Sequence, residues 1–76
     1  MKERIRDVIA DIVGEDPMSI PLDATQENVK GWNSIRHMNL VIALEKEFDV
    51  RFNDLQIAEM MSIDLIEDSI RELKSG

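Results

Sequence analysis

Residues 34–48, SIRHMNLVIALEKEF, decide the fold, because their apolar side chains recur with the spacing of an α-helix. Apolar residues at positions 35, 38, 41, 42, 44 and 48 cover a broad face at this spacing, and Leu40 widens it. A helix that is apolar over so much of its circumference is expected to lie at the centre of a bundle. We predict this helix from Asn33 to Phe48 or Asp49.

The segment from Lys2 to Val13 is predicted to form the first helix. Ile5, Val8, Ile9 and Ile12 give it an apolar stripe with the helical period, and Gly14 follows as a stop. Residues 15–32, between these two helices, contain both prolines and keep no sustained period, so we expect a long loop with room for a short helical turn. The residues expected to fix this loop to the core are Ile20, Leu22 and Val29.

Two shorter segments complete the chain. A third helix is predicted from Asp54 to Met61 after an Asn53 cap, with inward side chains at positions 55, 58 and 61. A fourth is predicted from Ile63 to Lys74 after a Ser62 cap. The predicted fold is therefore all-α, a four-helix bundle with a long first loop and a short third helix, formed by residues 1–76 as one domain.

Composition narrows the function. A chain of 76 residues has room for one core and no deep catalytic cleft, which favours a binding or carrier module over an enzyme. A net charge of −7 repels phosphate backbones and anionic lipids, so we expect neither nucleic acid nor membrane as a partner and favour basic protein surfaces. The lack of cysteine suits the cytoplasm. With one histidine, we expect no metal site.

A serine follows the expected helix cap of the central helix. Asn33 is a good N-cap, so Ser34 falls at the first helical position, where its hydroxyl is not needed for capping. The positive end of the helix dipole and free backbone N–H groups favour a phosphate ester at such a position. The alternative is that Asn-Ser precedes the helix for capping alone.

Gly31-Trp32-Asn33-Ser34-Ile35, followed by the apolar run that ends in Ala43-Leu44-Glu45-Lys46-Glu47-Phe48, resembles the acyl carrier protein family. The family pattern is Asp-Ser-Leu at the start of the second helix and Leu-Glu-x-x-Phe at its end. Length, acidity and the order of helices resemble the family over essentially the whole chain.

The resemblance implies a carrier whose Ser34 bears 4′-phosphopantetheine, transferred from coenzyme A by a phosphopantetheinyl transferase. The arm would supply the thiol that this chain lacks and would hold acyl or aminoacyl groups as thioesters. Loading and acyl-transfer enzymes would then be the further partners, and the carrier itself, expected to be a monomer, would need no catalytic residue. Fatty acid, polyketide, peptide and lipid-modification pathways all stay open.

One position departs from the family pattern, because Asn33 stands where aspartate is usual. The change is nearly neutral for a helix cap, but it removes a charge that a transferase could contact. Three interpretations stay open: a variant that is still modified, one that is modified slowly, or a degenerate carrier that is never modified. In the last case the chain would be a helical adaptor that binds a basic protein surface.

Six residues are candidates for contacts with partners. Ile35 and Ile42 are expected to form a partly exposed apolar patch. Arg36 and His37 either select a partner or lie on a solvated helix face. Glu45 and Glu59 belong to an acidic surface that either faces partners or serves solubility.

Overall fold

The computed structural model describes residues 1–75 of the chain. The elements are α1 (Lys2–Val13), the 3-10 helix η1 (Pro17–Ser19), α2 (Ser34–Phe48), α3 (Asp54–Glu59) and α4 (Ile63–Ser75). The described residues form no strand beyond one isolated bridge, between Thr25 and Ser62. The predicted all-α fold with a long first loop and a short third helix is confirmed, and α1, α2 and α4 begin and end within a residue of prediction.

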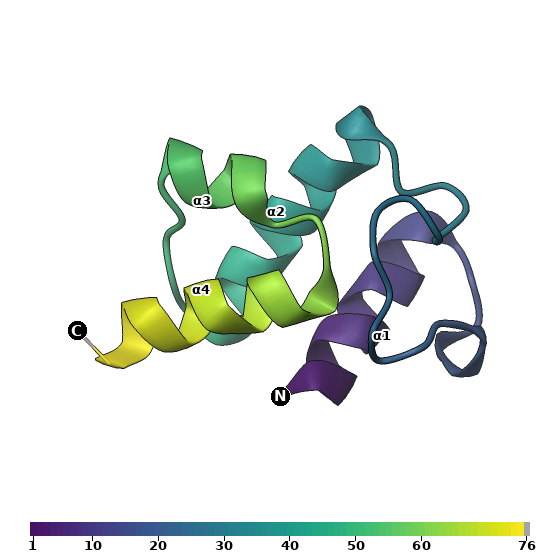
Figure 1. Cartoon of the computed structure of the whole chain (residues 1–76), viewed down its shortest axis with the longest axis horizontal. Helices are drawn as coiled ribbons and strands as arrows, with labels where there is room; N and C mark the ends of the chain where they lie inside the picture. Colours follow the sequence, from purple (N-terminus) through teal and green to yellow (C-terminus); the bar gives the residue numbers. More distant parts are fainter. Residues whose placement is uncertain (76) are drawn as a thin grey trace.

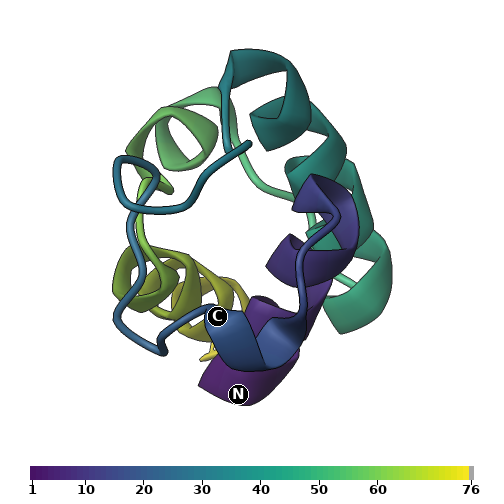
Figure 2. The same ribbon diagram turned by 90° about the vertical axis from the view of Figure 1, so that its right-hand side faces the viewer.

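The helices surround one apolar core (Figure 1, Figure 2). Seen end-on in Figure 2, α1 and α2 lie on one side of the bundle and α3 and α4 on the other. α1 contacts both α2 and α4. The largest side chains with less than 2% of their surface exposed come from α1, α2 and α4 and from Met60 just after α3: Ile5, Ile9, Leu40, Leu44, Met60, Ile63, Ile66 and Ile70.

Local sequence signals set the helix ends. α1 ends at Gly14, which has a φ of 75° in the left-handed region that glycine adopts without strain. Ser62 caps α4, because its hydroxyl accepts a hydrogen bond from the backbone N–H of Leu65. Asp64 in the first turn of α4 and Lys74 in its last turn match the helix dipole.

The long loop is fastened to the segment between α3 and α4. The N–H of Gln26 donates to the carbonyl of Met61 at 2.7 Å, and the N–H of Ile63 donates to the carbonyl of Ala24 at 3.1 Å. Ile20 and Val29 are buried, as predicted. Leu22 is 37% exposed, so its predicted burial is wrong.

The inward face of α3 differs from prediction. The helix ends at Glu59, two residues earlier than expected, and Leu55, Ala58 and Met61 are all exposed. The side chains that face the core instead are Gln56, which forms a reciprocal capping box with Asn53, the half-buried Ile57 and, just after the helix, Met60. The inward positions are thus 56, 57 and 60, and not 55, 58 and 61.

Candidate functional site

Ser34 is the first residue of α2 and its side chain is exposed. Asn33 precedes it in an extended conformation, and its side-chain oxygen accepts a hydrogen bond of 2.9 Å from the backbone N–H of Arg36. The predicted cap is therefore confirmed. Because Asn33 does the capping, the hydroxyl of Ser34 is left for other chemistry at the positive end of a helix of 15 residues.

Gly31 gives the chain its direction into α2. Its φ of +90° lies in the left-handed region, where an L side chain would be strained. A Cβ atom at this position would also lie 2.9 Å from Nη1 of Arg36. Glycine is therefore favoured here by the backbone, and a larger residue would also have to displace the end of the Arg36 side chain.

Arg36 reaches back from the first turn of α2 to the end of α1. Its Nη1 donates a hydrogen bond of 3.2 Å to the carbonyl oxygen of Val13. The last carbonyl groups of a helix have no partner within the helix and carry the negative end of its dipole, so a guanidinium group is well suited to this position. This contact fixes the start of α2 against α1.

His37 lies between the long loop and α3. The indole Nε1–H of Trp32 donates to Nδ1 of His37 at 3.0 Å, and Nε2 of His37 lies 2.9 Å from the carbonyl oxygen of Ile57. Trp32 is 4% exposed and its ring is stacked on the imidazole, with 6.1 Å between the ring centroids. The expectation of a solvated helix face is thus wrong for His37, which is half-buried with both nitrogens engaged.

Two adjoining grooves open beside the serine. The first, of about 350 Å³, is lined by residues that include Ser34, His37 and Ile57. The second, of about 630 Å³, is lined mainly by apolar surface and includes Trp32. Gln26 and Met61 line both grooves, so a long group attached near Ser34 has apolar surface within reach in either direction.

An exposed apolar stripe runs along α2 from the serine. Ile35 is 77% exposed, Met38 49% and Ile42 51%. They lie three and four residues apart, which places them on one face of the helix. This face has no covering partner among the described residues, and it begins directly beside Ser34.

The acids nearest this stripe are Asp54 of α3, which lines the groove of Ser34 and Met38, and Glu45, which lines a hollow beside Ile42. The first turn of α2 contains none, and the first acid along the helix is Glu45. Glu45 is half-buried and its carboxylate accepts a hydrogen bond of 3.0 Å from the backbone N–H of Phe52, so it holds the connection to α3. Glu59 is exposed on α3.

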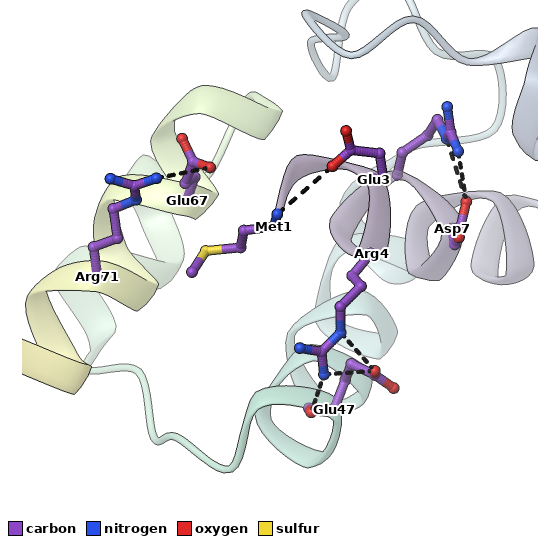
Figure 3. Close-up of polar contacts among 8 residues, drawn as sticks. Met1, Glu3, Arg4, Asp7, Glu47, Glu67 and Arg71 are labelled. Carbon is purple, nitrogen blue, oxygen red and sulfur yellow. Dashed lines mark hydrogen bonds and ion pairs between the residues drawn. The ribbon is translucent and has the colours of Figure 1, made fainter.

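Most ion pairs of the described residues involve α1 (Figure 3). A hydrogen bond from Lys2 to Asp64, together with the charge of that carboxylate, raises the pKa of Lys2. A hydrogen bond from its own backbone N–H lowers the pKa of Glu3, and the N-terminal ammonium adds to this effect.

Residues 1–75 contain neither a candidate metal site nor a helix that could span a membrane. No group of three or more His, Cys, Asp or Glu side chains lies close enough together to hold a metal ion. None of the helices in this part of the chain has the length and hydropathy needed to cross a membrane.

The structure brings some of the predicted site residues together and separates others. Asn33, Ser34, Ile35, Arg36 and His37 share the first turn of α2, and the exposed side chain of Ile42 lies further along the same helix. Glu45 lies near the opposite end of α2, and Glu59 on α3. Sequence reasoning missed the contacts of His37 with Trp32 and Ile57, because neither partner stands at a helical spacing from it.

Comparison with known proteins places this geometry in context. The family described as "Phosphopantetheine attachment site" matches residues 3–70. The chain is similar to an acyl carrier protein of Clostridium acetobutylicum, with 31% identity over 61 residues, which are 80% of this chain and 79% of that protein. It is also similar to an acyl carrier protein of Campylobacter concisus, with 30% identity over 71 residues, which are 93% of this chain and 92% of that protein.

Proposed function

The chain belongs to the acyl carrier protein family and is a phosphopantetheine-bearing carrier, and from this premise we propose that Ser34 is the residue to which the 4′-phosphopantetheine arm is attached. One observation carries the proposal: Ser34 is exposed at the first position of α2, while Asn33 provides the cap. The serine hydroxyl is thus accessible to a transferase and is not needed for the fold.

The surroundings of Ser34 fit a phosphodiester at this position. The first N–H groups of a helix and the positive end of its dipole stabilise a negative charge. The first turn of α2 itself contains no acid, and the one acid that lines the groove of Ser34 is Asp54 of α3. The two grooves that share Gln26 and Met61 offer the arm and its cargo apolar surface. The group itself would supply the thiol on which acyl or aminoacyl cargo is held.

Enzymes that act on the arm have to approach the start of α2. We infer that they cover the exposed side chains of Ile35 and Ile42 and that the exposed carboxylate of Glu59 contributes charge at the rim. Arg36 is exposed as well, although its guanidinium is bonded to the end of α1. His37 and Glu45 contribute indirectly, because their polar atoms are engaged within the protein.

The partners proposed are a phosphopantetheinyl transferase and the enzymes that load and remove acyl or aminoacyl groups. Carriers of this family are not catalysts, and we propose that residues 1–76 act as one carrier domain without catalytic activity of their own. The lack of cysteine supports a reducing compartment, and we propose the cytoplasm.

Asn33 stands where the family pattern has aspartate, so it bears on whether modification of Ser34 needs that negative charge. The asparagine keeps the cap bond to the N–H of Arg36, and this supports the proposal that the chain is still modified. Without the usual aspartate charge, we expect modification to be slower than in an Asn33→Asp variant, because a basic group of the transferase would have only a dipole to contact.

Intact-mass measurement after incubation with coenzyme A and a broad-specificity phosphopantetheinyl transferase tests the proposal. We expect a gain equal to one phosphopantetheine, which Ser34→Ala abolishes and Ser19→Ala, at another exposed serine, leaves unchanged. If the mass stays constant for both the native chain and Asn33→Asp, the unmodified adaptor becomes the better description. If only Asn33→Asp gains mass, the chain is a degenerate carrier.

A further inference from the structure

The imidazole of His37 joins three segments at the serine end of the bundle. It belongs to the first turn of α2, accepts a hydrogen bond from Trp32 in the loop, and lies 2.9 Å from the carbonyl oxygen of Ile57 on α3. Ser34, His37 and Ile57 line the same groove. Any movement of this imidazole would therefore change the wall of the groove next to the serine.

The partners of His37 fix its protonation and tautomer. An indole N–H can only donate, so Nδ1 has to accept. A carbonyl oxygen can only accept, so Nε2 has to donate. Both bonds exist together only in the neutral imidazole that carries its proton on Nε2. A second proton would sit on Nδ1, opposite the N–H of Trp32, and would break that bond.

α3 depends on such bonds more than the longer helices do. It has six residues, of which only Gln56 is buried. Short helices are held by tertiary contacts, because their own hydrogen bonds do not offset the entropy of ordering the chain. Two side chains of α2 hold the backbone of this region. Glu45 binds the N–H of Phe52, just before α3, and His37 binds the carbonyl of Ile57, in the last turn of α3.

We propose that His37 is a positioning residue of the carrier site: through Trp32 and the Ile57 carbonyl it holds α3 against the first turn of α2 and so sets the groove that the transferase meets beside Ser34. The role at Ser34 rests on the function proposed above. The charged groups around the imidazole are Asp54 of α3 in the same groove, Glu27 of the loop beyond the indole, and Arg36 on α2.

Two substitutions at position 37 separate hydrogen bonding from bulk. His37→Gln keeps one acceptor and one donor side by side, as the neutral imidazole has them, but cannot gain a proton. His37→Phe keeps a ring and removes both bonds. Trp32→Phe removes a single donor and leaves the bond to Ile57. Together, the three variants remove none, one or both of the hydrogen bonds of His37.

Amide hydrogen exchange of the unmodified protein gives the first measurement. At pH 7 we expect the α3 amides to exchange about tenfold faster in His37→Phe than in the native chain, while α1 is unchanged and His37→Gln stays close to native. Equal α3 exchange in His37→Phe and the native chain would overturn the proposal.

Nitrogen NMR of the histidine ring gives a spectroscopic test that needs no variant. At neutral pH we expect the proton on Nε2 and a bare Nδ1. A spectrum with the proton on Nδ1 would contradict the assignment. If His37→Phe loses protection in α1 as well, the substitution has disturbed the whole bundle, and Trp32→Phe becomes the deciding variant. Trp32→Phe removes one hydrogen-bond donor and should speed exchange in α3 alone. Unchanged α3 exchange in Trp32→Phe would then overturn the proposal.

Transferase kinetics test whether the hydrogen bonds of His37 affect the modification of Ser34. We expect His37→Phe to raise KM severalfold with a smaller change in kcat, and His37→Gln to restore the native KM. If the native chain is modified and His37→Phe shows an unchanged KM, this inference fails while the carrier function stands. If Ser34 is never modified, the carrier function fails. Amide hydrogen exchange and NMR still decide whether His37 holds α3 against α2.

Discussion

The first turn of α2 is connected to its neighbours by neutral hydrogen bonds and one arginine–carbonyl contact. Its last turn is connected to α1 by an ion pair and a cation–π contact. At the first turn, Asn33 caps the helix and His37 is bonded on both sides. At the last turn, Arg4 of α1 pairs with the Glu47 carboxylate at 2.9 Å (Figure 3). The guanidinium of Arg4 also lies 4.5 Å from the centre of the Phe48 ring.

The two ends should respond differently to salt, because salt weakens ion pairs more than it weakens hydrogen bonds between neutral groups. Exposed ion pairs contribute little and are screened by salt, while half-buried neutral bonds are hardly affected by salt. The first turn of α2, where a phosphodiester would be attached, contains no acid, and the acid that lines the same groove is Asp54 of α3. One end of the helix thus holds the proposed attachment site, and the other contributes most of the helix's charge.

The largest effect is expected from a change that weakens both ends at once. Leu44 has 0% of its surface exposed and packs in the core that α2 shares with its neighbours. Leu44→Ala should lower the free energy of unfolding by about 2–5 kcal/mol, because it leaves a cavity. The matched control Ile42→Ala, at a half-exposed site on the same helix, should change it by about 0.5 kcal/mol or less. Equal losses in urea melts would contradict this placement of the core.

A smaller effect should be confined to the serine end. Asn33→Ala removes the cap bond to the Arg36 N–H and should cost about 0.5–2 kcal/mol of unfolding free energy. Asn39→Ala, at an exposed position within the same helix, serves as the control and should cost nothing. Urea melts at low and high salt should give the same loss for Asn33→Ala. A loss that disappears in high salt would mean that charge, and not the cap, stabilises this end.

The charged end should respond to salt. A double-mutant cycle of Arg4→Met and Glu47→Gln should give a coupling energy of about 0.2–1 kcal/mol, because both side chains are largely exposed. The coupling should shrink in about 1 M salt, where the screening length falls to about 3 Å. A coupling unchanged by salt would remove the contrast between the two ends.

The smallest effect is expected for Lys2, whose pKa is raised by Asp64. A raised lysine pKa means that the stabilisation is complete below the ordinary pKa of lysine and is lost as pH rises through the raised value. Lys2→Met should therefore be slightly less stable than the native chain at neutral pH, and the difference should vanish in strongly alkaline solution. Thermal melts across this range measure it, and a difference that persists at high pH would contradict the ion pair.

The sequence was sufficient for the parts of the fold that follow helical periodicity. The bounds of α1, α2 and α4, the caps and the place of Ser34 follow from local patterns that need no knowledge of the tertiary structure. Whether Ser34 carries the arm stays a prediction, because family membership does not itself identify the modified residue.

Sequence reasoning failed where a distant contact decides. The inward face of α3 was wrong because this short segment offers two apolar patterns, 55, 58 and 61 or 57 and 60, and packing against the core selects the second. For His37 the sequence left open a partner contact or a solvated helix face, but its hydrogen-bond partners lie within the protein, 5 residues before it and 20 residues after it. Glu45 was assigned to a charged surface, but it binds the backbone of Phe52 across a turn. Such pairs depend on how the loop and α3 fold back onto α2.

Fragment mass spectrometry of the protein after incubation with coenzyme A and the transferase tests most directly whether Ser34 is the attachment point. The peptide that contains Ser34 should carry the mass of one phosphopantetheine, and the peptides with Ser19, Ser62, Ser69 and Ser75 should carry none. A modification found on any of those four serines, with Ser34 bare, would contradict the role of the helix start.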